Sequence, residues 1–336
     1  MAGLPPTAAS PQAPVADGGL PDGWVRVEVA ALSACGPVRD QNEDRLGWAV
    51  LGELGSVRSP GNDELAWARL EGPGIAIAVA DGLGGHSNGE LASRTAMGRL
   101  LRRMGSPDAA ARPGELLRAG FEEANQACLA GDLVDPVAFD RDPVGAEPLP
   151  ATERRRAAAS DPNPRLGLEP GGRNGQTTLT AIALTGRSGN VAHVGDCRLY
   201  RLRAGDIELL TGDHTQAREL VRMRVIKPEQ LLTHPGRHLL TRSIGGDPIV
   251  RVDERQSAPA VGDAYLLCTD GLWSGITSWE AMAALSGDLR AGVADLVARS
   301  AAAGGDDNAS VITLRVTALG GGPEPATGGW RFPWRR

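Results

Sequence analysis

The sequence predicts an α+β fold in which two antiparallel β-sheets stack on each other and α-helices cover their outer faces. Segments with the alternating or continuously apolar pattern of strands follow one another in blocks, and the amphipathic helical segments come in pairs. A doubly wound parallel sheet would instead require strands and helices to alternate along the chain. By its length, the chain of 336 residues is sufficient for one large domain or two small ones.

The first half of the chain is predicted to contain four strands followed by two helices. Residues 25–33 alternate apolar and other side chains, whereas residues 75–80 are apolar throughout, as in a buried strand. The strands are expected at 25–33, 46–51, 65–70 and 75–80, with 65–70 as one arm of a loop or hairpin over 52–74. The helices are expected at 89–103 and 113–130, where apolar residues recur at helical spacing.

Residues 131–172 interrupt this pattern, because they are rich in Pro, Asp and Arg and have almost no periodic arrangement of apolar residues. We predict a mobile insertion there, with a short helix near 151–159. Beyond it, strands are expected at 177–184, 190–193, 198–203, 207–210, 249–256, 264–268 and 309–316, and helical segments at 216–232, 279–284 and 289–303. The ends are rich in Gly and Pro, which predicts a disordered N-terminal segment (1–24), a folded domain (25–317) and a flexible tail (318–336).

The composition is that of a globular protein with moderate net acidity. A formal net charge of -6 disfavours nucleic acid or an anionic membrane as a general partner. No stretch reaches the roughly 18 apolar residues of a membrane span, and the N-terminus lacks the features of a secretory signal. The four cysteines, at 35, 128, 197 and 268, have no paired spacing, so we expect reduced thiols. These features predict a cytoplasmic protein, which we expect to be monomeric.

Four short acidic motifs, spread over most of the chain, are its most specific feature. They are Val-Arg-Asp-Gln-Asn-Glu-Asp (38–44), Asp-Gly-Leu-Gly-Gly-His (81–86), Thr-Asp-Gly-Leu (269–272) and Gly-Asp-Asp-Asn (305–308). Asp81 and Asp270 lie at the ends of apolar runs, and carboxylates clustered at strand ends are costly unless cations neutralise them. Oxygen ligands without an accompanying His or Cys set indicate Mg²⁺ or Mn²⁺. The motifs therefore predict one metal site and, since they come from both ends of the chain, one domain.

In this order, the motifs resemble those of the metal-dependent Ser/Thr protein phosphatases of type 2C, the PPM family, in their bacterial form. The matching stretches are 36–44, 80–93, 177–184, 193–200, 234–245, 262–272 and 307–311, so the resemblance extends from about residue 25 to about residue 316. A single Asp-Gly pair is common in turns, and the specificity lies in the complete ordered set. The resemblance implies a four-layer α-β-β-α fold, that is, a central β-sandwich flanked by helices, with metal ions at one end.

The resemblance also implies which residues bind two Mn²⁺ or Mg²⁺ ions. Asp81 would bridge the ions, and the backbone carbonyl of Gly82 would bind one of them. Asp270 and Asp307 would complete the coordination of the other ion. Asp306 competes for the last position, but the Asp-Asn pairing of the family favours Asp307.

Further acidic residues are expected around the two ions. Glu43 and Asp44 would accept hydrogen bonds from water ligands of the ions. Bacterial relatives often bind a weaker third ion through an Asp at the position of Asp196, with an acid four residues after the position of Asp270. Ser274 replaces that acid here, so we expect weaker occupancy of a third ion; the alternative for Asp196 is a structural turn residue.

Two residues are expected to act on the phosphate directly. Arg39 would bind it, since a guanidinium donates two parallel hydrogen bonds and stays charged at any useful pH. His86 would protonate the leaving alkoxide or position the substrate; in some relatives the acidic His follows the Asp-Gly pair directly, where this chain has Leu83. Residues 211–245 resemble the mobile flap that borders the substrate in this family.

The implied activity is direct hydrolysis of phosphoserine and phosphothreonine in proteins by water activated between two ions, opposing a Ser/Thr kinase. Its partners would be a phosphorylated protein and the cognate kinase. One alternative is a catalytically silent regulatory module, which the intact Arg39, Asp81, Asp270 and Asp307 disfavour. Another is a hydrolase of a nucleotide or nucleic acid; for nucleic acid, the acidic balance and the lack of a basic, aromatic groove argue against it.

Overall fold

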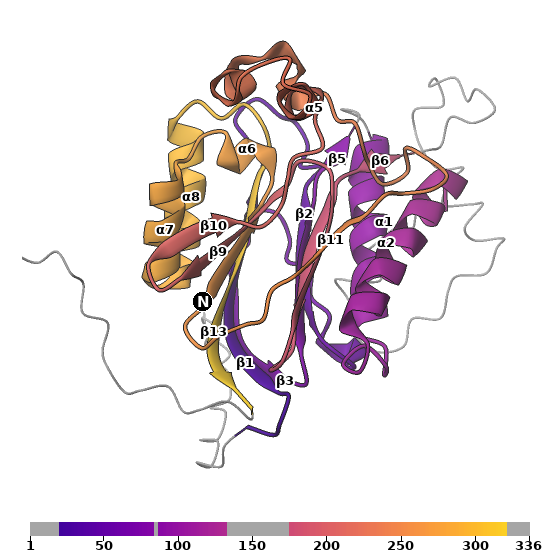
Figure 1. Cartoon of the computed structure of the whole chain (residues 1–336), viewed down its shortest axis with the longest axis vertical. Helices are drawn as coiled ribbons and strands as arrows, with labels where there is room; N and C mark the ends of the chain where they lie inside the picture. The colour runs from indigo at the N-terminus through magenta and orange to yellow at the C-terminus, as the bar shows by residue number, and fades with distance from the viewer. Residues whose placement is uncertain (1–19, 84–86, 133–174, 321–336) are drawn as a thin grey trace, which may run out of the picture.

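Two antiparallel β-sheets stack at the centre of the computed structural model, which describes residues 20–83, 87–132 and 175–320 (Figure 1). In spatial order, the first sheet consists of β10 (Asp206–Leu209), β9 (Arg198–Arg203), β12 (Ala264–Cys268), β13 (Ala309–Leu319), β1 (Val25–Ala34) and β3 (Ala66–Gly72). The second consists of β11 (Asp253–Gln256), β8 (Gly189–Val194), β7 (Leu179–Leu184), β4 (Ile75–Ala80) and β2 (Arg45–Val50). A short pair, β5 (Gly82–Leu83) and β6 (Gln176–Thr177), continues the chain beyond β4 and before β7.

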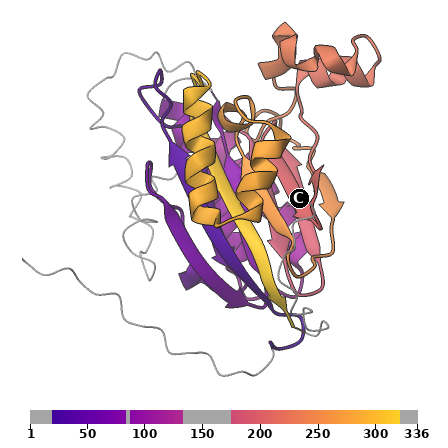
Figure 2. The ribbon, with the colours of Figure 1, turned by 90° about the vertical axis from the view of Figure 1, so that its left-hand side faces the viewer.

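Helices cover both outer faces of the sandwich, as predicted (Figures 1 and 2). The second sheet is covered by α1 (Ser87–Met104) and α2 (Pro113–Ala130), and the first by α7 (Ser278–Ser286) and α8 (Leu289–Ala302). The other helical elements within the described residues are η1 (Leu54–Ser56), α5 (Gln216–Arg222), η2 (Pro228–Thr233), η3 (Pro235–His238) and α6 (Asp270–Trp273). The α-β-β-α architecture is therefore confirmed.

The alternation of side chains along β4 shows how the layers are joined. Ile75, Ile77 and Val79 pack in the core between the two sheets, while the alanines between them face α1 and α2. Small alanine side chains let α1 approach the sheet closely. Full burial of each Ile or Val contributes about 1.5–3 kcal/mol, so this strand anchors both cores.

Three predicted elements differ in the structure. The strand expected at 177–184 is divided into β6 and β7, which belong to different sheets. The strand expected at 249–256 begins only at Asp253, because its partner β8 ends at Val194 and the chain then turns at Gly195 with φ +114°. The helix expected over 216–232 is divided into α5 and η2, since Arg224 adopts the left-handed φ of 60° and Pro228 begins the next helical turn.

The predicted domain ends also need adjustment where the structure describes them. Residues 20–24 form a turn that hydrogen-bonds to Gly320, β13 continues to Leu319, and Gly131 caps α2. The rest of the N-terminal segment, insertion and tail, with the short helix expected at 151–159, lies outside the described residues. All four cysteines are free. Across the described ranges, no helix has the length and apolarity needed to cross a bilayer.

Candidate active site

Five aspartates from distant parts of the chain face one another at one end of the sandwich. They are Asp44 before β2, Asp81 after β4, Asp196 between β8 and β9, Asp270 at the start of α6 and Asp307 before β13. Desolvation raises the pKa of Asp81 well above its usual value, and the charges of the other four raise it further. Charges shift one another's pKa in this way only at short range. The strand ends and turns that carry the five aspartates therefore form one site.

Asp44 is the most deeply buried of these carboxylates, with 1% of its surface exposed. Its Oδ2 accepts a 2.8 Å hydrogen bond from the Thr269 hydroxyl, which also accepts one from the backbone N–H of Ser310. Burial raises the pKa of Asp44 to about 8; hydrogen bonds from Ser310 and Thr269 oppose the rise, and Asp270 and Asp307 add to it. A carboxylate in this position is ionised near neutral pH only if positive charge is brought to it.

Asp81 and Gly82 are fixed by the strands on either side of them. The backbone carbonyl of Asp81 accepts hydrogen bonds from the Thr178 N–H at 2.8 Å and the Thr177 hydroxyl at 2.7 Å. A Cβ on Gly82 would lie 2.3 Å from the carbonyl oxygen of Gly89 in the first turn of α1. Only glycine fits here without movement of α1, so the backbone rather than a side chain is presented at this point.

Glu43 and Arg39 are held by the residues that precede β13. Asn308 accepts a hydrogen bond from the Glu43 N–H at 2.9 Å and donates one to the Gln41 carbonyl at 3.0 Å. Arg39 forms a 2.9 Å ion pair with Asp307, and both side chains are nearly half exposed. Arg39 therefore lies beside Asp307, and Asn308 is a positioning residue that the sequence analysis missed.

Asp196 and Asp270 approach each other around α6. Burial, followed by the charge of Asp270, raises the pKa of Asp196 well above its usual value. The Trp273 indole N–H donates a 3.0 Å hydrogen bond to the Asp196 carbonyl, and the Arg198 guanidinium lies 3.6 Å from the centre of the Trp273 ring. Trp273 thus connects the turn at Asp196 to α6, a role with no local sequence signal.

His238 is a further residue that sequence reasoning did not assign to the site. It comes from η3, and its Nδ1 lies 3.5 Å from Oδ2 of Asp270. The side chain of His238 is half exposed and faces the site. His86, the predicted acid, falls outside the described residues.

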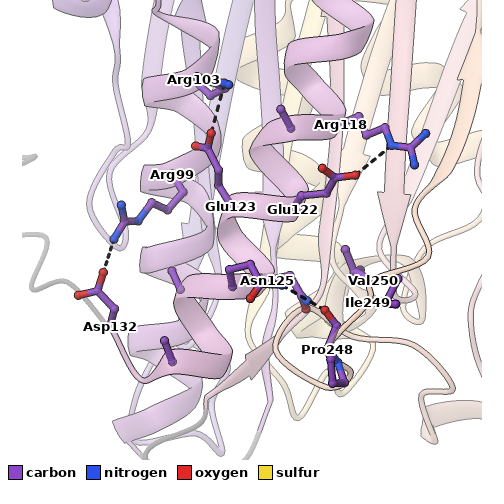
Figure 3. Close-up of a pocket in the computed structure, with 14 residues that line it drawn as sticks. Arg99, Arg103, Arg118, Glu122, Glu123, Asn125, Asp132, Pro248, Ile249 and Val250 are labelled. Atoms are coloured by element: carbon purple, nitrogen blue, oxygen red, sulfur yellow. Dashed lines mark hydrogen bonds and ion pairs between the residues drawn. The ribbon is translucent and has the colours of Figure 1, made fainter.

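A cavity of about 730 Å³ adjoins the aspartates. Its lining includes three residues of the acidic motifs, Arg39, Asp270 and Asp307. Ser274 and the flap residues Arg237 and His238 also line it. A second cavity, of about 830 Å³, lies over α1, α2 and residues 248–250 (Figure 3). It contains none of the predicted site residues, and its arginines pair with its own acids, as in Arg99–Asp132, Arg103–Glu123 and Arg118–Glu122 (Figure 3). The smaller cavity is the candidate substrate cleft.

The chemistry of the donor set fits hard divalent cations. All five groups are carboxylates, none of the acidic motifs brings a cysteine ligand, and their close approach without positive charge is unfavourable. Among the described residues, no three His, Cys, Asp or Glu side chains are grouped tightly enough to hold a metal ion in their present positions. The carboxylates of Asp44, Asp270 and Asp307 each contact a protein group instead. Metal binding would therefore exchange some of these contacts.

Comparison with known protein families identifies the family of the chain. The family model for protein phosphatase 2C matches residues 56–302 of this chain. The chain belongs to the protein phosphatase 2C family. It is 29% identical over 242 residues to the Ser/Thr protein phosphatase PstP of Mycobacterium tuberculosis, a match that covers 71% of this chain but 40% of PstP. It is 27% identical over 244 residues to the Ser/Thr phosphatase stp of Listeria monocytogenes, covering 71% of this chain and 83% of that protein.

Solved structures of family members have the same fold. The crystal structure of M. tuberculosis PstP superposes with a TM-score of 0.62 at 26% identity and covers 87% of this chain and 100% of that one. The PPM phosphatase MsPP of Mycobacterium smegmatis, in complex with cacodylate, gives 0.56 at 28% identity, with 87% and 98% covered. The PstP catalytic domain in complex with two manganese ions gives 0.59 at 26% identity, with 87% and 99% covered.

Proposed function

We propose that this protein phosphatase 2C chain hydrolyses phosphoserine and phosphothreonine in proteins with the help of two Mn²⁺ or Mg²⁺ ions. The observation that carries the proposal is the meeting of five buried or half-buried aspartates with Arg39 beside one cleft. Family membership and the two manganese ions of the PstP catalytic domain support it. The proposed ligands of the two ions are Asp81, the Gly82 carbonyl, Asp270 and Asp307. Asp196, together with the shared Asp270, is proposed to bind a weaker third ion.

Each of the proposed site residues would have a distinct task in this reaction. When bound, the ions would supply an activated water at neutral pH and charge stabilisation for the phosphoryl oxygens. Arg39 uses one nitrogen for Asp307, which leaves further N–H groups for phosphate oxygens. Thr269 orients the Asp44 carboxylate, and Asn308 fixes the backbone of Glu43; both acids are proposed to hold and orient water. His86 is proposed as the acid for the leaving alkoxide, on sequence grounds.

The proposed substrate is a phosphorylated protein, and the proposed functional partner is the Ser/Thr kinase that phosphorylates it. We further propose that the chain works as a monomer in the cytoplasm. The cleft is bordered by the flap and by the loops around α6, and this opening would admit a phosphorylated side chain from an extended peptide.

The assignment of the metal ligands is tested with two adjacent aspartates. Asp307→Asn should lower Mn²⁺-dependent phosphate release from a phosphothreonine peptide by at least about 100-fold, because it removes a ligand charge. Asp306→Asn is the matched control, since it changes the neighbouring exposed carboxylate, and it should retain most of the activity. Equal losses in the two variants would refute the ligand assignment.

The choice of substrate is tested in the same assay. A phosphothreonine peptide, a nucleoside monophosphate and a phosphodiester are offered to the Mn²⁺-loaded wild type. Turnover of the peptide alone would support the proposal. Faster turnover of the nucleotide or diester would indicate another hydrolase, and a folded protein that turns over none of the three would indicate a regulatory module.

A further inference from the structure

The flap of this chain has a charge opposite to that of the whole molecule. We define the basic flap as residues 216–242, which include α5, η2 and η3. It contains six arginines and lysines and two glutamates, giving it a net charge of +4 with histidines neutral, whereas the whole chain carries -6. Such a local excess of one sign on an acidic protein attracts groups of the opposite charge.

Most of the positive charge on the basic flap is available to a partner. Within the described ranges, only Arg222 and Arg242 of the six form ion pairs, with Glu219 and Asp253. The other four make no ion pair with a described residue and are exposed: Arg218, Arg224, Lys227 and Arg237.

Exposed apolar side chains accompany these cations. Met223, Val225 and Leu239 are 63%, 66% and 58% exposed. Arg and Met are both enriched where proteins bind one another, and charged groups around an apolar centre are typical of an interface rim. The composition therefore fits a surface that binds a peptide, with anionic side chains as its polar contacts.

The basic flap reaches the candidate substrate cleft directly. Arg237 and His238 line the cleft together with Arg39 and Asp270, and His238 lies 3.5 Å from Asp270. The basic flap lies at the end of the sandwich near α6 and β5 (Figure 1) and projects from the body of the molecule (Figure 2). A peptide whose phosphorylated residue enters the cleft would therefore have neighbouring residues over the basic flap.

We infer that the basic flap binds acidic residues that flank the phosphorylated residue, so that the substrates are phosphoproteins with Asp or Glu close to the phosphorylation site. This inference rests on the proposed function. The one acidic residue of the cleft lining without a proposed metal role, Asp306, belongs to the loop before β13 and not to the flap. The acidic side of the peptide is therefore oriented toward Arg237 and away from Asp306.

The inference is tested with peptides that differ only in charge. Three phosphothreonine peptides carry Glu, Gln or Lys at the positions flanking the same core, and kcat/KM for phosphate release is measured with Mn²⁺ at low and high salt. Wild type should prefer the Glu peptide over the Gln peptide by about 5- to 20-fold at low salt, since several exposed ion pairs each contribute modestly. The preference should shrink as salt screens the charges.

Charge-reversal variants distinguish recognition from damage to the fold. The double variant Lys227→Glu, Arg237→Glu should prefer the Lys peptide, a gain that misfolding cannot produce. Arg118→Glu, an exposed arginine on α2 outside the cleft, is the matched control and should keep the wild-type order. Equal kcat/KM for all three peptides in wild type, or an unchanged order in the double variant, would overturn the inference.

Binding measured without turnover separates this inference from the proposed function. Fluorescein-labelled versions of the same peptides are titrated with wild type in EDTA and followed by fluorescence anisotropy. Tighter binding of the Glu peptide supports the basic flap as an acidic-peptide surface even if no peptide is hydrolysed, in which case only the proposed function fails. Equal binding of the Glu and Gln peptides counts against the inference even in an active enzyme.

Discussion

Replacing Asp44 with Asn should stabilise the metal-free protein at alkaline pH, although Asp44 is buried and hydrogen-bonded. The pKa of Asp44 is raised from 3.8 to about 8, chiefly by burial. A raised pKa means that the folded state keeps a proton that the unfolded state releases, so stability is full below pH 4 and is lost as the pH rises to about 8. From the pKa values, the loss is about 2 kcal/mol at pH 5 and about 5 kcal/mol at pH 8.

Asn cannot ionise, so the variant avoids this loss, but it weakens hydrogen bonding with Thr269 and Ser310 at a cost of about 1–3 kcal/mol. In EDTA, Asp44→Asn should therefore be about as stable as wild type at pH 5 and more stable by about 2–4 kcal/mol at pH 8. Urea denaturation followed by circular dichroism measures both values. Adding Mn²⁺ at pH 8 should stabilise wild type more than the variant. A difference between the two proteins that is the same at pH 5 and pH 8 would refute the reasoning.

Three further changes have expected outcomes. Gly82→Ala places a Cβ 2.3 Å from the Gly89 carbonyl oxygen, so a melting curve should show a loss of about 1–3 kcal/mol and the phosphatase assay a loss of activity. His214→Leu removes the acceptor of the Gly195 N–H and should cost about 1–3 kcal/mol at pH 8. Because the pKa of His214 is lowered by burial, wild type loses stability as the pH falls through 6.5, and the variant should lose less. Arg39→Lys should lower kcat/KM by about 10- to 100-fold with little change in melting temperature, since lysine lacks the two-pronged geometry and the replaced ion pair is exposed.

The layers of the fold were predictable because local pattern and tertiary role agree. The apolar run of β4 is buried on both faces, and α2 begins at Pro113 and ends before Gly131, whose φ of 64° caps the helix. Where the structure differed, tertiary partners decided the outcome. The first four residues of the strand expected at 249–256 have no neighbouring strand to pair with, and α6, with four residues, is too short to show a helical period.

The sequence allowed prediction of only those site residues that belong to recognisable motifs. Asp44, Asp81, Asp270 and Asp307 carry recognisable neighbours in the sequence, and the structure brings their carboxylates together. His238 has no such neighbours, and its contact spans 32 positions of the chain to Asp270. A contact of this kind depends on how the flap folds back over α6, which no local spacing encodes.

The most direct test of the central claim is phosphate release from a phosphothreonine peptide as a function of Mn²⁺ concentration, in wild type and in Asp81→Asn. We expect saturable, Mn²⁺-dependent turnover that EDTA abolishes, and at least about a 100-fold loss in the variant, because Asp81 faces all four of the other aspartates. Turnover that persists in EDTA, or an Asp81→Asn variant with wild-type activity, would contradict the claim that this carboxylate cluster is a metal-dependent phosphatase site.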